Sequence, residues 1–230
     1  MSKKINRLIL FLLVSLAISL QASAWHDETH LAIAKAAGYQ KWYNAAGADI
    51  AKIKAGKIEA HNHFSNNAPD ITITPEMVLS QIERYNRIDR DGHLYGAIIT
   101  SLRDYIREKG LGKYGQYHLA YCIHYIGDLS MPLHNTISND FNQKNHTKID
   151  GIINDEVIDN LDKIKIYPIK IRNESDLVKE ISRIANVSKS LGYKIEQENR
   201  LLTKEEAYTQ ISHSASLIKA ILSYAENASR

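Results

Sequence analysis

Apolar residues recur every three or four positions along most of this chain, and that spacing limits the folds open to it more than any other feature. Leu31, Ile33, Ala34 and Ala37 would share one side of a helix, which Gly38 should end. We find no convincing run of alternating apolar and polar residues of the kind that marks a half-buried strand. The pattern therefore predicts an all-α fold.

Further helices are expected wherever the same spacing continues between glycine and proline residues. Thr74 is a possible N-cap for one of them, with Pro75 at its first position. Another should stop near Pro132, because proline cannot continue a helix. The expected helical ranges are 75–88, 94–109, 116–128, 148–164, 174–191 and 204–226. A short extended connector is expected over residues 162–172. No internal repeat or change in composition marks a second domain, so residues 25–230 are expected to form one compact single-domain helical bundle.

The first 24 residues have the parts of a secretory signal peptide. Three basic residues precede an apolar run over residues 8–20, and Ala22-Ser23-Ala24 supplies the small residues needed for cleavage. The run is shorter than the roughly 18 to 20 residues that span a bilayer, which disfavours a retained anchor. Cleavage before Trp25 is therefore expected, and the mature protein should be secreted or periplasmic.

The mature chain should be close to electrically neutral. The whole net charge of +3 comes from the three basic residues of the predicted signal peptide, which leaves 26 basic and 26 acidic residues. Composition therefore gives no sign of the strongly basic face that drives nonspecific nucleic-acid binding. Cys122 is the only cysteine, so no internal disulfide can form. Bound metals or an ordinary hydrophobic core must stabilise the chain instead.

Histidine and aspartate residues that could bind metal are concentrated in one region. Seven of the ten histidines lie between His61 and His146. The clearest motif runs from His124 through Asp128 to His134. Residues i and i+4 project from one face of a helix, so His124 and Asp128 can share a metal ion. The proline before His134 should redirect the backbone that carries it.

His146 and Asp150 repeat the i,i+4 spacing, and imidazole and carboxylate groups are suitable zinc ligands. Either pair alone could be an ordinary surface hydrogen bond. Two such pairs on either side of a third histidine, within 27 residues, indicate a metal site instead. A site with His and Asp but no thiolate is typical of zinc that keeps an open coordination position.

The series His-x-x-x-Asp-x-x-x-x-x-His, followed by His-x-x-x-Asp, resembles the zinc-dependent phospholipase C and S1/P1 nuclease superfamily. That family is an all-helical bundle with a trinuclear zinc site. Its processed chains begin with a Trp whose amino group and carbonyl oxygen bind zinc, followed by a His ligand, and Trp25 and His30 match these positions. The family also places an Asp about 14 residues before a His-Phe pair, which Asp49 and His63-Phe64 match.

The resemblance implies three zinc ions and a ligand for each position. One ion would be held by Asp49, His63, His124 and Asp128. A second would be held by His134, His146 and Asp150. The third would be held by the α-amino group and carbonyl of Trp25, by His30 and by the shared carboxylate of Asp128. His61 is the alternative to His63, because both side chains would point the same way from an extended backbone. The resemblance ends at Asp150.

The same resemblance implies a secreted zinc-dependent phosphodiester hydrolase. Zinc can lower the pKa of bound water from 15.7 to about 7 and can polarise a phosphoryl oxygen. Water activated in this way is expected to attack the phosphodiester, with Asp49 as a metal ligand and a candidate proton acceptor. The sequence implies no obligate protein partner.

Phospholipid is the first expected substrate, which implies a phospholipase C that makes transient contact with a membrane surface. The lack of disulfides resembles the bacterial phospholipase branch, and Glu28 stands where some phospholipases contact the headgroup. Single-stranded nucleic acid is the alternative. The spacing from Trp25 to His30 is closer to the nuclease branch, and Phe64 could stack on a base. A secreted zinc-binding protein without catalytic turnover is the third interpretation.

Overall fold

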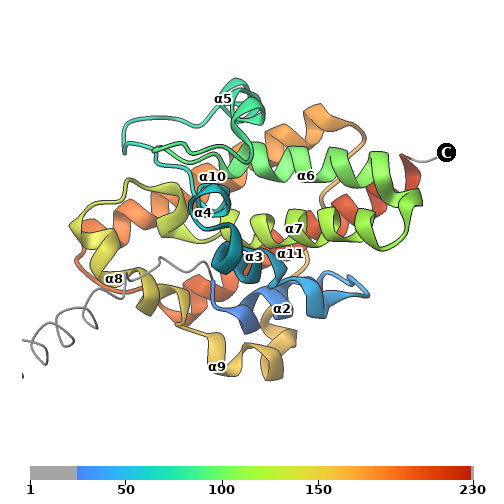
Figure 1. The fold of residues 1–230 in the computed structure, drawn as a ribbon. Coiled ribbons are helices and arrows are strands. Elements are labelled where there is room, and N and C mark those ends of the chain that lie inside the picture. The colour runs from blue at the N-terminus through green and yellow to red at the C-terminus, as the bar shows by residue number, and fades with distance from the viewer. Residues whose placement is uncertain (1–24, 229–230) are drawn as a thin grey trace, which may run out of the picture.

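Helices and the turns between them make up the described part of the chain, residues 25–228 (Figure 1). In this computed structural model, the only β-type pairing within that range is an isolated bridge between Ser65 and Gly92. The predicted all-α fold is therefore confirmed. The predicted signal peptide, residues 1–24, lies outside the described residues.

Most connections between the helices are short. The N-terminal half contains α2 (Asp27–Ala36), η1 (Trp42–Asn44), α3 (Gly47–Ala55), α4 (Lys57–Ala60), α5 (Pro75–Ser80), η2 (Ile82–Arg84), α6 (Leu94–Glu108) and η3 (Lys109–Leu111). The C-terminal half contains α7 (Lys113–Leu129), η4 (Pro132–Asn135), α8 (Asp140–Asp150), α9 (Asn154–Val157), η5 (Ile158–Lys163), α10 (Glu174–Gln197) and α11 (Lys204–Asn227).

The helix expected over residues 75–88 begins as predicted but ends early. Thr74 is its N-cap and accepts a hydrogen bond from the main-chain N–H of Met77 at 3.3 Å. The helix stops where the backbone of Gln81 meets α6, and the Gln81 side chain accepts a hydrogen bond from the Tyr95 N–H at 2.9 Å. Tertiary contact therefore replaces the last predicted turns with the short helix η2.

The prediction of one helix over residues 148–164 is wrong. Helix α8 begins earlier, behind Asn139, whose side chain accepts a hydrogen bond from the Asn142 N–H at 3.0 Å. It ends at Asp150, and Gly151 begins a turn. The predicted helix missed this N-cap, and its range included the break at Gly151 together with α9 and η5. The connector expected over residues 162–172 is shorter than predicted: η5 continues to Lys163, and only residues 165–171 are free of helix, turn and bend.

Helices α3 and α4 were not predicted at all. Their large apolar residues, Ile50, Ile53 and Ile58, are exposed to solvent, whereas Lys52 and Glu59 are buried. A helix that buries its charged residues and exposes its isoleucines reverses the amphipathic pattern by which helices are recognised.

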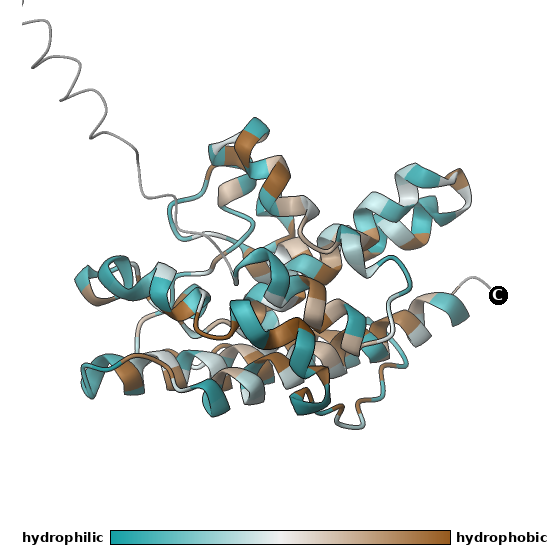
Figure 2. Cartoon of the chain, turned by 90° about the horizontal axis from the view of Figure 1, so that it is seen from below, coloured by the Kyte–Doolittle hydropathy of each residue, from teal (hydrophilic) through white to brown (hydrophobic). Residues whose placement is uncertain are grey.

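The core is formed mainly by α6, α7, α10 and α11, which run across the molecule in Figure 1. Helix α7 packs extensively against α6, and most of its residues from Leu119 to Leu129 are buried. Figure 2 shows hydrophobic and hydrophilic bands alternating along these helices, as expected for elements that bury one face. Cys122 is fully buried in this core, where it packs as a small apolar side chain.

The two longest helices, α10 and α11, each have 24 residues and well-formed N-termini. Thr203 and Glu206 form a capping box at the start of α11. Among the described residues, no helix is long and apolar enough to cross a membrane.

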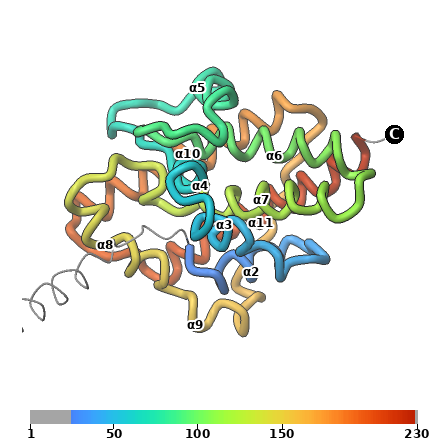
Figure 3. The backbone as a smooth tube through the Cα atoms, in the orientation of Figure 1, coloured from blue at the N-terminus to red at the C-terminus, as the bar shows by residue number. Residues whose placement is uncertain are grey.

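Several smaller elements lie around α7. Figure 3 shows α3 crossing α7 near the middle of the molecule, with α2 beside it and α8 toward one end. Both α2 and α3 contact α7 directly, and η4 follows it in the chain. Most of the predicted metal ligands lie on these elements or on α7 itself.

The close packing of α6 on the end of α5 predicts a large stability difference between two glycine substitutions. In Gly96→Ala, the new Cβ would lie 2.2 Å from the main-chain oxygen of Gln81, which must move to admit it. We expect a loss of about 1–3 kcal/mol in the free energy of unfolding, measured by urea denaturation. Gly110→Ala is the matched control, because a Cβ there has no neighbour within 4 Å. Equal stability of the two variants would contradict the packing described.

Candidate metal centre

The predicted ligands come from five elements and a loop. Helix α2 supplies His30, α3 supplies Asp49, and the loop after α4 supplies His63. The remaining ligands, His124 and Asp128 on α7, His134 on η4, and His146 and Asp150 on α8, lie further along the chain. All except Asp49 are buried, and the Asp49 side chain is 12% exposed. The fold thus gathers side chains that are distant in sequence into one buried region.

The first group of ligand atoms consists of His63 Nδ1, His124 Nε2 and Asp128 Oδ2. The two imidazole nitrogens lie 3.2 Å apart, and the Asp128 oxygen lies 2.9 Å from His63 and 3.4 Å from His124. Ligands bonded at about 2.0 Å to a tetrahedral zinc ion are separated from one another by about 3.3 Å. Asp49 borders this group, with its two oxygens 3.8 Å from His63 Nδ1 and 3.7 Å from His124 Nε2. The spacing therefore fits one small cation.

The second group consists of His134, His146 and Asp150. The Nε2 atoms of the two histidines lie 3.0 Å apart, and Asp150 Oδ2 is 3.4 Å from His146 Nε2. The close approach of two imidazole nitrogens needs either a shared proton or a cation between them. The ligand atoms of all three residues lie within 4.8 Å of one another.

His30 joins the centre through the other oxygen of Asp128. Its Nε2 lies 3.3 Å from Asp128 Oδ1, and its ring stacks on that of His124 with centroids 3.8 Å apart. Gly127 makes this approach possible, since a Cβ at that position would lie 2.4 Å from His30 Nδ1. Asp128 therefore presents one oxygen to His30 and the other to His63 and His124.

Trp25 lies immediately before α2 and is fully buried. Its indole Nε1 donates a hydrogen bond to Ser130 Oγ at 3.3 Å, which attaches the start of the predicted mature chain to the end of α7. Ser130 is only two residues from Asp128 in the sequence. Ligation of a metal by the Trp25 amino group and carbonyl oxygen stays a prediction.

The second nitrogen of several imidazoles is held by an oxygen acceptor. Nδ1 lies 2.8 Å from the Ala45 carbonyl oxygen in His124, 2.5 Å from the His63 carbonyl oxygen in His134, and 2.7 Å from Asn142 Oδ1 in His146. An N–H donated from Nδ1 leaves the lone pair of Nε2 directed into the centre. Metal-binding histidines are oriented in this way in proteins.

His63 is oriented in the opposite sense. Its Nδ1 faces the first group, while its Nε2 lies 3.4 Å from Glu59 Oε1. Glu59 is itself held by hydrogen bonds from Tyr125, through its hydroxyl at 2.5 Å, and from Asn62 at 3.1 Å. Sequence reasoning missed Glu59, although its i,i+4 spacing to His63 was a detectable signal.

Lys52 was missed as well. Its Nζ lies 2.7 Å from Asp49 Oδ1, and the side chain is almost completely buried. The i,i+3 spacing on a helix could have indicated this pair. Burial opposes ionisation of Asp49, but the neighbouring His124 and Lys52 hold its pKa well below the usual value. The Asp49 carboxylate is therefore ionised at neutral pH.

Several of the buried polar atoms fit a metal ion better than they fit a metal-free protein. Both oxygens of Asp150, Oδ1 of Asp128 and Nε2 of His30 make no hydrogen bond of good geometry, although His30 Nε2 and Asp128 Oδ1 lie 3.3 Å apart and Asp150 Oδ2 lies 3.4 Å from His146 Nε2. Unpaired buried polar groups are costly, and burial raises the pKa of Asp150 well above its usual value. Burial also lowers the pKa of His124 to about 3 and that of His134 to about 4, which keeps them in the neutral form that binds metals.

The structure places the other candidate residues outside these groups. His61 ends α4 in a helical conformation, not the extended one expected, and its Nδ1 contacts the Lys57 carbonyl oxygen. Its ring packs near that of Phe64, which is half-buried, with centroids 5.8 Å apart. Glu28 is exposed in the first turn of α2 and accepts a hydrogen bond from Asn154.

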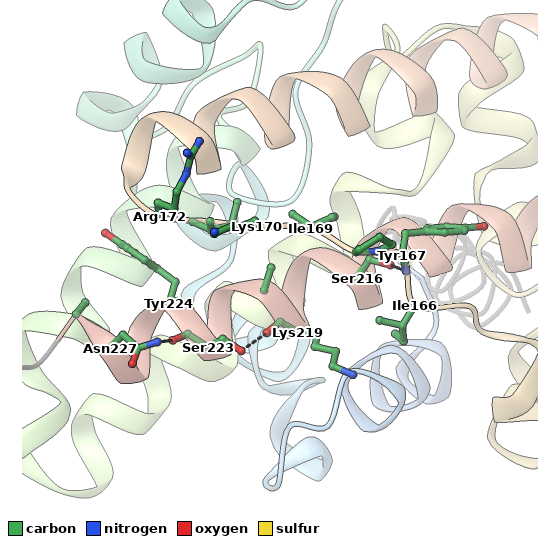
Figure 4. A pocket seen from close by; sticks show the side chains of 14 residues that line it. Ile166, Tyr167, Ile169, Lys170, Arg172, Ser216, Lys219, Ser223, Tyr224 and Asn227 are labelled. Carbon is green, nitrogen blue, oxygen red and sulfur yellow. Dashed lines mark hydrogen bonds between the residues drawn. The ribbon is translucent and has the colours of Figure 1, made fainter.

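A separate pocket of about 770 Å³ lies between residues 166–172 and α11 (Figure 4). Lys170, Arg172 and Lys219 are among the residues that line it. Its lining contains no histidine, cysteine, aspartate or glutamate, so it has neither a metal-binding group nor a carboxylate for acid–base chemistry. The His/Asp groups are therefore the better candidate for the functional site.

The orientation of His63 by Glu59 predicts a defect in metal affinity. In Glu59→Gln the charged acceptor beside His63 Nε2 is lost while the size of the side chain is kept. We expect zinc affinity to fall by about 10–100-fold, measured by competition with a chromogenic chelator. Glu83→Gln, an exposed change on η2, should bind zinc like the unsubstituted protein. Unchanged affinity in Glu59→Gln would remove His63 from the metal-binding groups.

Comparisons with known proteins leave the family of this chain open. No family model matches it, and no curated protein or solved structure is significantly similar. Support for buried His/Asp groups that could bind metal ions therefore comes from the positions of the side chains and not from similarity to other proteins.

Proposed function

We propose that this protein is a secreted, zinc-dependent phosphodiester hydrolase. The observation that carries the proposal is the position of Asp128, whose two oxygens face His30 on one side and His63 and His124 on the other. A carboxylate that faces candidate ligands on both sides could contribute to two metal positions a short distance apart. Paired metals stabilise both the attacking and the leaving oxygen in displacement at phosphorus.

Zinc at these positions would supply Lewis acidity and lower the pKa of a water molecule. The chain itself supplies Asp49 and Lys52 at the most exposed part of the centre. The ionised Asp49 carboxylate can orient a water molecule and accept its proton. The Lys52 ammonium beside it places a positive charge where an anionic phosphoryl group would bind.

Phospholipid is the substrate class that we propose first. Helix α3 directs Asp49 and Lys52 toward the centre, while its Ile50 and Ile53 side chains are 61% and 71% exposed. An apolar surface next to a phosphodiester site favours a substrate with apolar chains. Glu28 is exposed at the start of α2, where a carboxylate could meet a cationic headgroup.

Single-stranded nucleic acid is the second candidate. Phe64 directly follows His63 and is only half-buried, so its ring could stack on a base. The third candidate, a zinc-binding protein without turnover, would share every feature of the centre except activity.

An assay of the zinc-loaded protein beginning at Trp25 tests these candidates together. The substrates are phosphatidylcholine, phosphatidylinositol, single-stranded DNA and a soluble chromogenic phosphodiester. We expect hydrolysis of the two lipids and of the soluble diester, loss of activity on chelation, and recovery with zinc. Asp128→Ala should lose activity and metal from two positions, because one of its oxygens faces His30 and the other faces His63.

Each other outcome identifies a different function. Cleavage of DNA alone would establish the nuclease and reject the phospholipase. Stoichiometric zinc binding with no cleavage of any substrate would reject an enzyme. Full activity and full zinc content in Asp128→Ala would reject the shared carboxylate.

The predicted role of the Trp25 amino group gives an independent test. A chain with two extra residues before Trp25 has no free amino group at that position, so it should bind one zinc ion fewer and lose most activity. Zinc content is measured by atomic emission and compared with the chain that begins at Trp25. Equal zinc content in the two chains would exclude the amino group as a ligand.

A further inference from the structure

An exposed apolar surface lies on the outer side of the metal centre. We call it the α3–α7 surface and define it by Tyr43, Ile50, Ile53, Lys54, Tyr114 and Tyr117. Figure 1 shows α3 in front of α7, and the two helices are in contact. Tyr43, Ile50, Lys54 and Tyr117 line one shallow pocket of about 360 Å³, so these side chains are neighbours.

The exposure of this surface is unusual for large apolar residues. Exposed fractions are 62% for Tyr43, 61% for Ile50, 71% for Ile53, 65% for Tyr114 and 56% for Tyr117. Ile53 is one helical turn from Ile50, and Tyr114 is one turn from Tyr117. Ile53 and Tyr114 therefore extend the apolar surface along α3 and α7. Contiguous apolar residues on a surface indicate an interaction site, whereas isolated ones need no explanation.

Lysines outnumber carboxylates in the segments that form the α3–α7 surface. Residues 40–58 and 111–121 contain five lysines and one acidic residue, Asp49. Glu59, just after the first range, is buried, and Glu108, just before the second, is paired with Arg107 and His118. Asp49 is paired with Lys52 inside the centre. The other four lysines, Lys41, Lys54, Lys57 and Lys113, are exposed. A partner for this surface must therefore accept apolar side chains and carry negative charge.

An anionic lipid surface meets both requirements. Isoleucine side chains enter the acyl boundary, tyrosines are favoured at the membrane interface, and lysines are attracted to anionic headgroups. Nucleic acid would meet only the charge and aromatic requirements, because the aliphatic Ile50 and Ile53 offer no ring on which a base can stack.

We infer that the α3–α7 surface seats this protein on anionic phospholipid bilayers, with α3 lying at the interface. This inference rests on the proposed phospholipase function and deepens it. Helix α3 carries the membrane-contacting Ile50 and Ile53 and also Asp49 and Lys52 of the metal centre. Binding to the bilayer therefore places the centre within a helix diameter of the headgroup layer.

The test separates vesicle binding from catalysis. The zinc-loaded protein is sedimented with vesicles of phosphatidylcholine that contain about one-third phosphatidylserine, and with vesicles of phosphatidylcholine alone. Released headgroup is measured in the same tubes, and hydrolysis of a soluble chromogenic phosphodiester is measured separately. We expect stronger binding to the anionic vesicles and weaker binding at high salt.

Two variants and one control probe the surface itself. Ile50→Ser/Ile53→Ser removes the apolar contact, and Lys54→Glu/Lys57→Glu reverses the charge. Each should bind anionic vesicles about tenfold more weakly while cleaving the soluble diester normally. Leu79→Ser/Ile88→Ser is the matched control, since these exposed apolar residues lie elsewhere and should leave vesicle binding unchanged. Thermal unfolding of each variant checks that the fold is intact.

The outcomes distinguish this inference from the proposed function. If both surface variants bind vesicles as the unsubstituted protein does, the inference is wrong, even if lipid is cleaved. If the protein binds vesicles through this surface but cleaves no lipid, the inference stands and the phospholipase proposal fails. Surface-dependent binding to oligo(dT) without binding to vesicles would overturn the inference in favour of nucleic acid.

Discussion

The carboxylate of Asp128, which is fully buried among imidazole rings, is the interaction on which the centre of this fold depends. An ionised carboxylate without exposure to water is stable only when neighbouring groups compensate its charge. The neighbours are His30 from α2, His63 from the loop after α4, and His124 from its own helix. Helix α2, the loop after α4 and helix α7, which are far apart in the sequence, therefore meet around one side chain. Gly127 completes the arrangement, because no other residue leaves room for the His30 ring.

The sequence was informative where local spacing determines the geometry. The helical period predicted the all-α fold, and the i,i+4 pairs His124/Asp128 and His146/Asp150 predicted side chains that the structure brings together. The spacing of apolar residues predicted the wrong helix bounds where a tertiary contact ends the helix. The break at Gln81 comes from packing against α6 and leaves no sign in the apolar pattern of α5.

Helix α3 was missed for a different reason. Its exposed isoleucines and buried Lys52 violate the rule by which amphipathic helices are found, and such violations concentrate where a protein interacts with something else. The contact between Trp25 and Ser130 joins residues 105 positions apart, which no local pattern could reveal. His61 and His63 could not be separated from sequence because the turn that ends α4 was not foreseen.

Five separate elements and one loop contribute to the His/Asp groups, and this has a consequence for how the chain resists unfolding. His63 and Asp128 are 65 residues apart, and His63 and His124 are 61 apart, so an ion bound by them closes long loops in a chain that has no disulfide. The entropic cost of closing a loop grows only with the logarithm of its length, so these long loops cost little more to close than short ones. Metal binding to the native state then shifts the unfolding equilibrium by mass action. If zinc binds as proposed, resistance to proteolysis would follow the free zinc concentration of the surroundings, and the survival of this protein would report the local zinc supply.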